Sequence, residues 1–331
     1  MIDPEHYLGS SGLAFKGTVM TEITGRHWLM IAALGLTWGG TFLIIEIALR
    51  GITPFWLAAA RIGFGAVLTT AIWQLRGGKQ FASPPSLPQR YTLCLLGMLS
   101  TAIPFMLLSW GQQYVTSGFA GVSMAAIALM VLPLAHVFVP GERMTWRRVL
   151  GFVIGFIGVS ILIGGQAFDS SGAEMELLGR VACLSAACCY AVSSILTRRL
   201  PPIDPIGLAA VLLLIGSLGV IPMALIVEGP PPALDIQTLV AVATLGLVAT
   251  AAANVLRVIV IRSAGPVFMS LVNYQVPVWS VLLGALFLAE PLPSTMIWAL
   301  GLILCGVGLS QYGALKRLFG TVLSKRTQRQ V

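Results

Sequence analysis

A few ionisable side chains interrupt long apolar runs of this sequence, and they are the first candidates for chemistry. Glu46 and Arg61 stand in two successive runs, and His136 and Arg257 stand in later ones. An ionisable group inside an apolar helix is costly, so it usually has a partner or a function. The chemistry open to these groups is the binding of an ion or a charged substrate, or the movement of a proton.

Glu46 and Arg61 are separated by one short connection, so the two side chains could meet between antiparallel helices. One interpretation is a structural ion pair that ties the two helices together. A second makes the pair a gate, or makes Glu46 a proton-coupling carboxylate. A third lets the charged ends reach the membrane surface. The sequence leaves these alternatives open.

Arg257 lies more than one helical turn inside its run, beyond Arg262, which we expect to anchor the end of the helix. At that depth Arg257 could face a cavity and attract a substrate carboxylate. His136 lies near the end of another run, where it is either a packed, hydrogen-bonded group or a proton relay. Arg257 is therefore a substrate-binding candidate, and His136 joins Glu46 and Arg61 as a candidate for gating or coupling.

The richest polar cluster inside an apolar run is Asn273-Tyr274-Gln275, followed by Pro277. Three consecutive polar side chains facing lipid would be expensive, so they must contact other helices or water. Pro277 removes a backbone hydrogen bond and favours a kink that leaves a carbonyl free, so it joins the gating candidates. The cluster either lines a substrate cavity or forms hydrogen bonds between helices. The other cavity candidates are polar, aromatic or sulfur-containing side chains in apolar runs: Trp110, Gln113, Ser123, Met124, Asn254 and Trp279.

The composition sets the class of protein that can carry these residues. Of the 331 residues, 57% are hydrophobic and only 10% are charged, whereas a soluble domain has about 25% charged residues. The chain must therefore be surrounded largely by lipid. Its net charge of +8 then reflects the Lys and Arg that orient membrane proteins, and we expect no nucleic-acid partner. The five cysteines lie in apolar runs without partners in polar loops, so no disulfide, metal site or cofactor is expected.

Ten apolar runs are long enough to cross a bilayer, which takes about 20 residues. They must be helical, because lipid cannot satisfy an unpaired backbone group. Their approximate bounds are 27–49, 54–76, 91–113, 117–139, 146–166, 175–198, 205–228, 236–262, 265–289 and 293–315. With the N-terminus in the cytoplasm, most of the 20 Lys and Arg residues fall on the cytoplasmic side. We therefore predict an all-α integral membrane protein with both termini cytoplasmic.

The second half of the chain repeats the first. The stretch from Gly118 to Leu162 recurs from Ala264 to Ser310, with Glu142 opposite Glu290 at a numbering offset of 148. Each repeat holds five helices, an odd number, so the second repeat enters the membrane from the opposite side. This predicts two inverted five-helix repeats with a substrate site between them. The predicted divisions are a cytoplasmic tail 1–26, a first repeat 27–166, a second repeat 175–315 and a basic cytoplasmic tail 316–331.

The first helices of the two repeats also have features at corresponding positions. Trp38-Gly39-Gly40 lies near the position of Tyr190-Ala191-Val192, and Thr53-Pro54 lies near that of Asp204-Pro205. Glycines at a spacing of four, such as Gly151 and Gly155, allow helices to approach closely. We read these glycines as packing surfaces within the chain, and a homodimer built on them stays open.

Three segments carry a family resemblance: LGLTWGGTFLIIEIALRGITPFWLAAARIGFGA, GERMTWRRVLGFVIGFIGVSIL and AEPLPSTMIWALGLILCGVGLS. From Trp28 to about Leu315 the chain resembles the EamA-type drug/metabolite transporter superfamily. The resemblance implies ten helices, cytoplasmic termini and export or exchange of small metabolites. Within the superfamily the chain looks most like bacterial inner-membrane exporters of amino acids, including aromatic ones. It departs from many relatives at Glu46, near which they carry a basic residue.

The leading function is therefore a secondary transporter with a small-molecule substrate and the lipid bilayer as partners. The chain has no Gly-rich loop with Lys and Ser/Thr for a nucleotide. A sugar-phosphate or nucleotide-sugar carrier would need several cavity Lys or Arg, and only Arg61 and Arg257 stand inside helices. An embedded enzyme would need clustered catalytic groups, and a channel would need charge rings or a filter loop. Neither pattern is present, so we expect no enzymatic activity.

Overall fold

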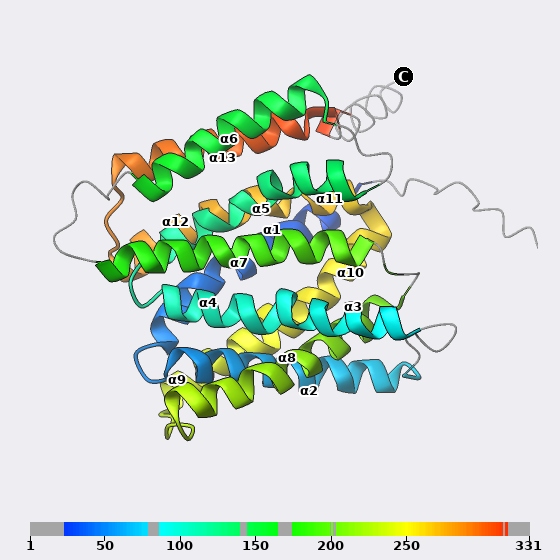
Figure 1. The fold of residues 1–331 in the computed structure, drawn as a ribbon, viewed down its shortest axis with the longest axis vertical. Helices are drawn as coiled ribbons and strands as arrows, with labels where there is room; N and C mark the ends of the chain where they lie inside the picture. The colour runs from blue at the N-terminus through cyan, green and yellow to red at the C-terminus, as the bar shows by residue number, and fades with distance from the viewer. Residues whose placement is uncertain are drawn as a thin grey trace, which may run out of the picture.

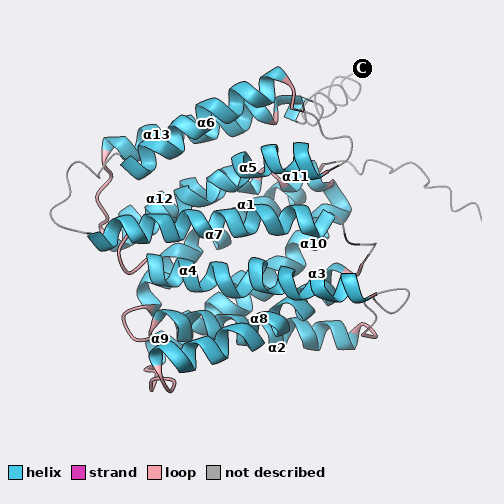
Figure 2. Ribbon diagram, viewed as in Figure 1, coloured by secondary structure: helices cyan, strands magenta, loops and turns pink. Residues whose placement is uncertain are grey.

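The computed structural model describes residues 23–78, 86–139, 144–164, 174–198, 200, 203–313 and 315–316. Over these residues the chain is helical, and no strand occurs (Figure 2). The elements are α1 (Gly25–Ala48), α2 (Pro54–Leu75), α3 (Leu87–Gly97), the π-helix η1 (Met98–Ala102), α4 (Ile103–Gly111), α5 (Ser117–Phe138), α6 (Trp146–Gly164), α7 (Glu174–Arg198), α8 (Pro205–Glu228), α9 (Ile236–Ala243), the π-helix η2 (Thr244–Ala252), α10 (Ala253–Ala264), α11 (Pro266–Met269), α12 (Val272–Leu288) and α13 (Ser294–Ser310).

The helices lie where the apolar runs predict them. Two runs form single rods that contain a π-helical section, α3–η1–α4 and α9–η2–α10. In the described part of the chain, seven helical stretches are long and apolar enough to cross a membrane, and α12 and α13 are shorter apolar helices. Many large hydrophobic side chains are exposed on the outside of the bundle, as lipid contact requires. The all-α prediction is confirmed for the described residues, and the length of these apolar helices agrees with a protein that spans a membrane.

The rods lie side by side in a layered bundle (Figure 1). The pair α6 and α13 forms one edge, and α2, α8 and α9 form the opposite edge. Between these edges, α1 packs against α12, α5 packs against α7, and α7 also packs against α4. The bundle thus brings helices from the two halves of the chain into repeated contact.

The α6–α13 contact depends on glycine. A Cβ atom placed on Gly306 would lie 2.5 Å from both the carbonyl oxygen of Gly151 and the backbone nitrogen of Gly155. The two backbones therefore touch directly, which only small residues permit. Gly308, two residues further along α13, would meet nothing within 4 Å.

Two glutamates hold the same end of the bundle together, and we call it the glutamate end. Glu290, between α12 and α13, accepts hydrogen bonds from the backbone N–H groups of Ser117 (2.7 Å) and Gly118 (3.0 Å). These groups open α5, and the first N–H groups of a helix have no backbone acceptor within the helix and carry a partial positive charge. Ala289, at φ 53°, ends α12 in the left-handed region and turns the chain toward this contact.

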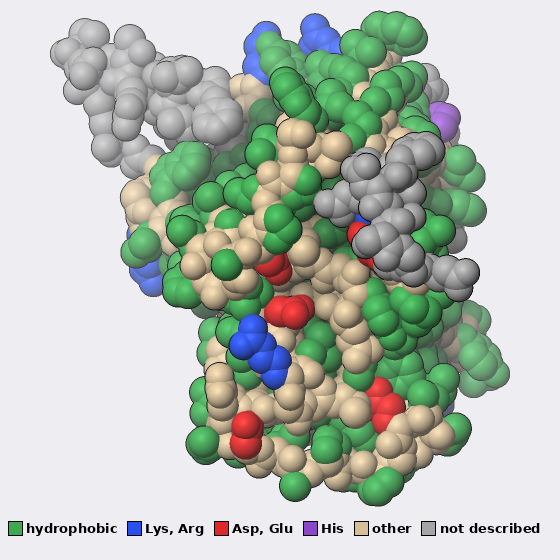
Figure 3. Space-filling model, turned by 90° about the vertical axis from the view of Figure 1, so that its left-hand side faces the viewer, with side chains coloured by type: hydrophobic (Ala, Val, Ile, Leu, Met, Phe, Trp, Pro, Cys, Tyr) green, Lys and Arg blue, Asp and Glu red, His purple; other side chains and the backbone are tan. Residues whose placement is uncertain are grey.

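Glu228 does the same for α2 from the C-terminal end of α8. It accepts hydrogen bonds from the N–H groups of Phe55 (2.9 Å) and Trp56 (3.1 Å) and from the Thr53 hydroxyl (2.5 Å). Each carboxylate therefore joins segments that are far apart in the sequence. Figure 3, which looks onto this end, shows acidic side chains gathered there.

Replacing Glu290 by alanine should destabilise the protein. The variant leaves two N–H groups of α5 without their acceptor and removes a favourable charge from the helix N-terminus, a loss of about 1–2 kcal/mol. We expect a lower thermal-unfolding midpoint for the purified protein in detergent, with Glu290→Gln intermediate because its amide oxygen can still accept one hydrogen bond. An unchanged midpoint in Glu290→Ala would show that water replaces the carboxylate without loss.

Gly306→Ala should also lower the unfolding midpoint, because its Cβ would force α6 and α13 apart. Overpacking of this kind costs about 1–3 kcal/mol. The matched control is Gly308→Ala on the same helix, which meets open space and should leave the midpoint unchanged or slightly raised. Equal midpoints for the two variants would contradict the direct backbone contact.

Candidate functional site

Arg61 is a buried charged side chain that contacts helices of both halves of the chain. It projects from α2 and is only 8% exposed. Its Nε–H donates a 3.0 Å hydrogen bond to the Thr250 hydroxyl oxygen in η2. Its guanidinium carbon lies 4.1 Å from the ring centroid of Phe105 in α4. Tyr190 of α7 packs against the buried cluster that contains Phe105 and Ile62, the neighbour of Arg61 in α2.

The π-helix η2 explains why Thr250 can hold Arg61. The Thr250 hydroxyl donates to the Leu245 carbonyl, five residues earlier, at 2.9 Å. Its oxygen lone pairs are then directed toward a donor, and the Arg61 Nε–H supplies one. The backbones of α2 and η2 are close here, because a Cβ on Gly246 would lie 2.8 Å from the Arg61 carbonyl oxygen. Such widened turns are frequent at functional sites.

Further polar groups surround this contact. The indole N–H of Trp38 in α1 donates to the Ala249 carbonyl at 3.1 Å. The Asn254 side-chain amide in α10 donates to the Thr250 carbonyl at 2.5 Å. Trp38, Arg61, Phe105, Tyr190, Thr250 and Asn254 make up what we call the central polar cluster. It combines one fixed positive charge with aromatic surface, which suits an anionic ligand that has an apolar or aromatic part.

The structure does not form the ion pair between Glu46 and Arg61 that one interpretation of the sequence expected. Arg61 points toward η2 and α4, whereas Glu46 lies near Glu290 and Arg50 at the glutamate end. One Glu46 carboxylate oxygen, Oε2, is buried without a hydrogen-bond partner. The short connection between α1 and α2 sets the two residues on neighbouring helices, but the rotation of each helix turns them apart.

The polar residues of α12 point in different directions, and part of this helix packs against α1. The side chain of Gln275 fills the space over Gly35, and Trp279 fills the space over Gly39. Asn273 is exposed, while the Tyr274 hydroxyl is buried without a hydrogen-bond partner. Pro277 is buried, and the Ser280 hydroxyl donates to its carbonyl oxygen at 2.9 Å.

The remaining candidates are distributed over the bundle. Ser123 is buried and donates to the Ala120 carbonyl of its own helix at 2.7 Å, and Met124 packs in the core beside it. Trp110 contacts Tyr114 edge to face, with ring centroids 5.1 Å apart, and Gln113 is exposed nearby. None of these contacts belongs to the central polar cluster.

Two ionisable candidates lie toward the opposite end. His136 is exposed in the last turn of α5, where a positive charge would be favourable next to the helix C-terminus. Arg257 is exposed one turn beyond Asn254 and forms no ion pair with the described residues.

The sequence reading missed four members of the cluster as site residues: Trp38, Phe105, Tyr190 and Thr250. Only the correspondence of Trp38 with Tyr190 between the repeats pointed at two of them. It also missed Gln112, whose amide donates to the Phe42 carbonyl at 3.0 Å and ties α4 to α1. Gln112 is 2% exposed, whereas its neighbour Gln113 is exposed. Two adjacent glutamines cannot be told apart without the helix rotation.

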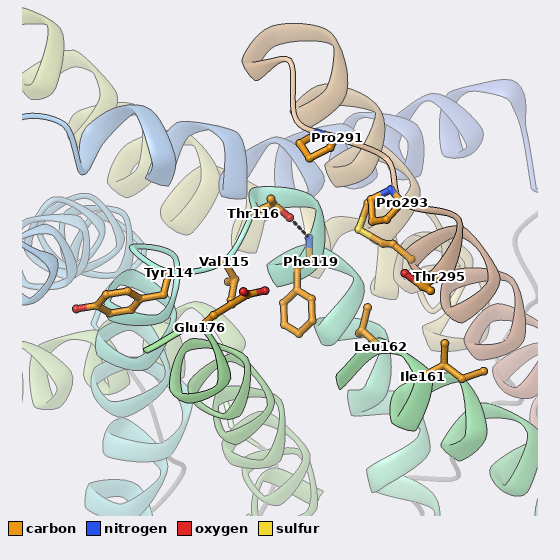
Figure 4. A pocket seen from close by; sticks show the side chains of 11 residues that line it. Tyr114, Val115, Thr116, Phe119, Ile161, Leu162, Glu176, Pro291, Pro293 and Thr295 are labelled. Atoms are coloured by element: carbon orange, nitrogen blue, oxygen red, sulfur yellow. Dashed lines mark hydrogen bonds between the residues drawn. The ribbon is translucent and has the colours of Figure 1, made fainter. Parts of the chain in front are cut away.

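A separate cavity of about 260 Å³ opens at the glutamate end (Figure 4). It lies between α5, α6, α7 and α13, and its lining includes Phe119, Ile161 and Met296. Its acidic lining residue, Glu176, is paired with Arg180. The cavity shares no residue with the central polar cluster and has no free charged group, so it is a poorer candidate for a polar ligand. Among the described residues, no group of three or more His, Cys, Asp or Glu could hold a metal.

Comparisons with known proteins agree with this fold. An uncharacterised transporter of Archaeoglobus fulgidus is 25% identical over 85% of this chain and 97% of its own. The inner membrane transporter YedA of Escherichia coli K12 is 27% identical over 85% of this chain and 89% of its own. A probable terminal-alkyne amino-acid exporter of Streptantibioticus cattleyicolor is 25% identical over 48% of this chain and 52% of its own.

A solved crystal structure 19% identical to this chain superimposes with a TM-score of 0.62, covering 87% of this chain and 98% of that one. The model of the EamA-like transporter family matches residues 26–164 and 177–311. The two matches take in nearly all the helices that build the bundle and the central polar cluster. The chain is therefore a membrane transporter that belongs to the EamA-like transporter family.

Proposed function

We propose that the chain exports amino acids, aromatic ones included, across the bacterial inner membrane by alternating access. Ten transmembrane helices form two inverted five-helix repeats, 27–166 and 175–315, and both termini are cytoplasmic. The glutamate end then faces outward. The observation that carries the proposal is the central polar cluster, a buried cation and aromatic rings placed where the two halves meet.

The helix contacts support the internal symmetry. Exchanging the two halves turns the α1–α12 contact into the α7–α5 contact, because each joins the first helix of one half to the fourth of the other. The α2–α8 and α6–α13 contacts join equivalent helices and are unchanged by the exchange. The π-helices η1 and η2 occur in equivalent rods, and the family model matches each half separately. A pseudo-twofold axis produces this pattern.

Inverted symmetry also supports alternating access. Glu290 and Glu228 close the glutamate end by joining distant helices. A transporter that opens at this end must release such contacts while equivalent ones form at the other end. Glu142 occupies the place of Glu290 in the first repeat and lies outside the described residues. Glu46, which lies beside Glu290 at this end, is then a gating residue.

The substrate class rests on chemistry and on one relative. One buried arginine suits a single carboxylate, whereas a phosphate dianion calls for several cations. Trp38, Phe105 and Tyr190 offer rings against which an aromatic side chain could stack. The Streptantibioticus relative, matched over about half its length, is named as a probable amino-acid exporter.

Counterflow of labelled phenylalanine, tryptophan and threonine into liposomes tests this function. We expect saturable counterflow of the two aromatic amino acids by the reconstituted wild type. Phe105→Ala should raise the KM for them roughly 2–10-fold, since a ring contact contributes about 0.5–1.5 kcal/mol. Threonine should be affected less.

The matched control is Trp146→Ala, which removes an exposed aromatic at the start of α6 and should leave the KM unchanged. The assay is repeated with and without a pH gradient, in the wild type and in Glu46→Gln. Counterflow that needs the gradient and vanishes in Glu46→Gln would make the transporter proton-coupled. If none of the three amino acids shows counterflow, the amino-acid assignment is wrong.

A further inference from the structure

Arg61 has unused hydrogen-bonding capacity. A guanidinium carries five N–H donors, and only the Nε–H of Arg61 is bonded, to Thr250. The two terminal nitrogens form no hydrogen bond with the described residues, and no described Asp or Glu pairs with them. Both terminal nitrogens also keep some accessible surface, unlike the fully buried polar atoms that have no hydrogen-bond partner.

A lone cation at this position is expensive. Burial of an unpaired charge costs several kcal/mol even after relaxation, and a membrane-embedded arginine is costly in the same way. The Phe105 ring and the Thr250 hydroxyl recover part of this loss. Neither neutralises the charge, so an anion that enters the bundle would be strongly favoured beside Arg61.

Tyr190 offers a second donor near Arg61. Its hydroxyl forms no hydrogen bond with the described residues, and like the Arg61 nitrogens it is not fully enclosed. The Tyr274 hydroxyl, by contrast, is completely buried. Tyr190 packs against the buried cluster that contains Ile62, the neighbour of Arg61 in α2, and Phe105, whose ring lies over the guanidinium. Donors from α2 and α7 therefore border the same cluster.

We propose that Arg61 and Tyr190 bind the carboxylate of the transported substrate, where α2 and α7 meet α4 and η2. The Thr250 hydroxyl accepts the Nε–H of Arg61, and the Phe105 ring covers one face of the guanidinium. The terminal nitrogens can then donate two hydrogen bonds to one carboxylate. The inference rests on the proposed function for the nature of the substrate. It goes further by naming the group that is recognised and the two residues that recognise it.

The two halves of the chain explain why the site takes one carboxylate. If the helix starts at Pro54 and Pro205 are aligned, the second half has Leu212 in the place of Arg61. Leu212 is buried and belongs to an apolar cluster with Leu93 and Leu96. Arg61 therefore has no cationic counterpart at the aligned position of the second half, which fits a monoanion.

The test measures binding to the purified full-length protein with three probes. Phenylalanine has a carboxylate and an amine, 3-phenylpropanoate has only the carboxylate, and phenylalaninamide has only the amine. Binding is followed by equilibrium dialysis and by the shift of the thermal-unfolding midpoint. We expect the wild type to bind both carboxylates at least tenfold more tightly than the amide, because the amide leaves the charged donors unpaired.

Arg61→Gln should weaken binding of the two carboxylates tenfold or more and leave phenylalaninamide unaffected. Arg61→Lys should recover part of the loss, and Tyr190→Phe should weaken the carboxylates by a smaller factor. Arg147→Gln is the control. It removes the same charge from α6, where the guanidinium lies 5.1 Å from the Tyr312 ring centroid, and should bind all probes like the wild type.

Two results would overturn the carboxylate site: a wild type that binds the amide as well as it binds phenylalanine, or an Arg61→Gln variant that binds the carboxylates normally. If Arg61→Gln does not fold, Tyr190→Phe decides through the same comparison of probes. A wild type that binds phenylalanine and 3-phenylpropanoate through Arg61 but shows no counterflow would overturn the proposed transport function and leave the carboxylate site standing.

Discussion

Lipid offers no hydrogen bonds to a polypeptide backbone, and most features of this structure follow from that constraint. Each long apolar run must satisfy its own N–H and C=O groups, so each becomes a helix. Helix ends still leave groups unpaired, and Glu290 and Glu228 supply acceptors for α5 and α2 from across the bundle. The irregular turns η1 and η2 are tolerated because they are packed against other helices rather than exposed along their length.

The same constraint explains how much of the fold could be predicted from the sequence. Apolar length fixes where a helix must lie, so the expected runs coincide with the observed rods. The low share of charged residues points to a protein surrounded by lipid, and the repeated stretch around Glu142 and Glu290 points to two related halves. The side of each helix that faces the interior could not be predicted in this way, because most helices here are apolar on every side and are hardly amphipathic. The placement of Glu46 and Arg61 shows this: their spacing was read correctly, and their directions were not.

Site residues were therefore harder to identify than helices. The stretch Asn273-Tyr274-Gln275 is conspicuous in sequence because three polar residues are adjacent, yet adjacent residues on a helix point in different directions. Gln275 packs on Gly35 and Tyr274 turns into the core. Thr250 is inconspicuous in sequence, but the five-residue step of η2 turns its hydroxyl toward Arg61. A π-helical turn leaves no recognisable pattern in a single sequence.

The helix contacts of the two halves are similar, whereas the side chains of the central polar cluster differ between them. Contacts between equivalent helices of the two halves, such as α6–α13, depend on small residues that let the two backbones meet. The central polar cluster is where the halves differ, with Arg61 in one and Leu212 in the other. A scaffold that exchanges two near-equivalent states needs closely similar halves, whereas an asymmetric substrate needs unlike ones. In the alternating access that we propose, confining the difference to a few interior side chains would meet both requirements, because it would leave the helix–helix contacts of the two states alike.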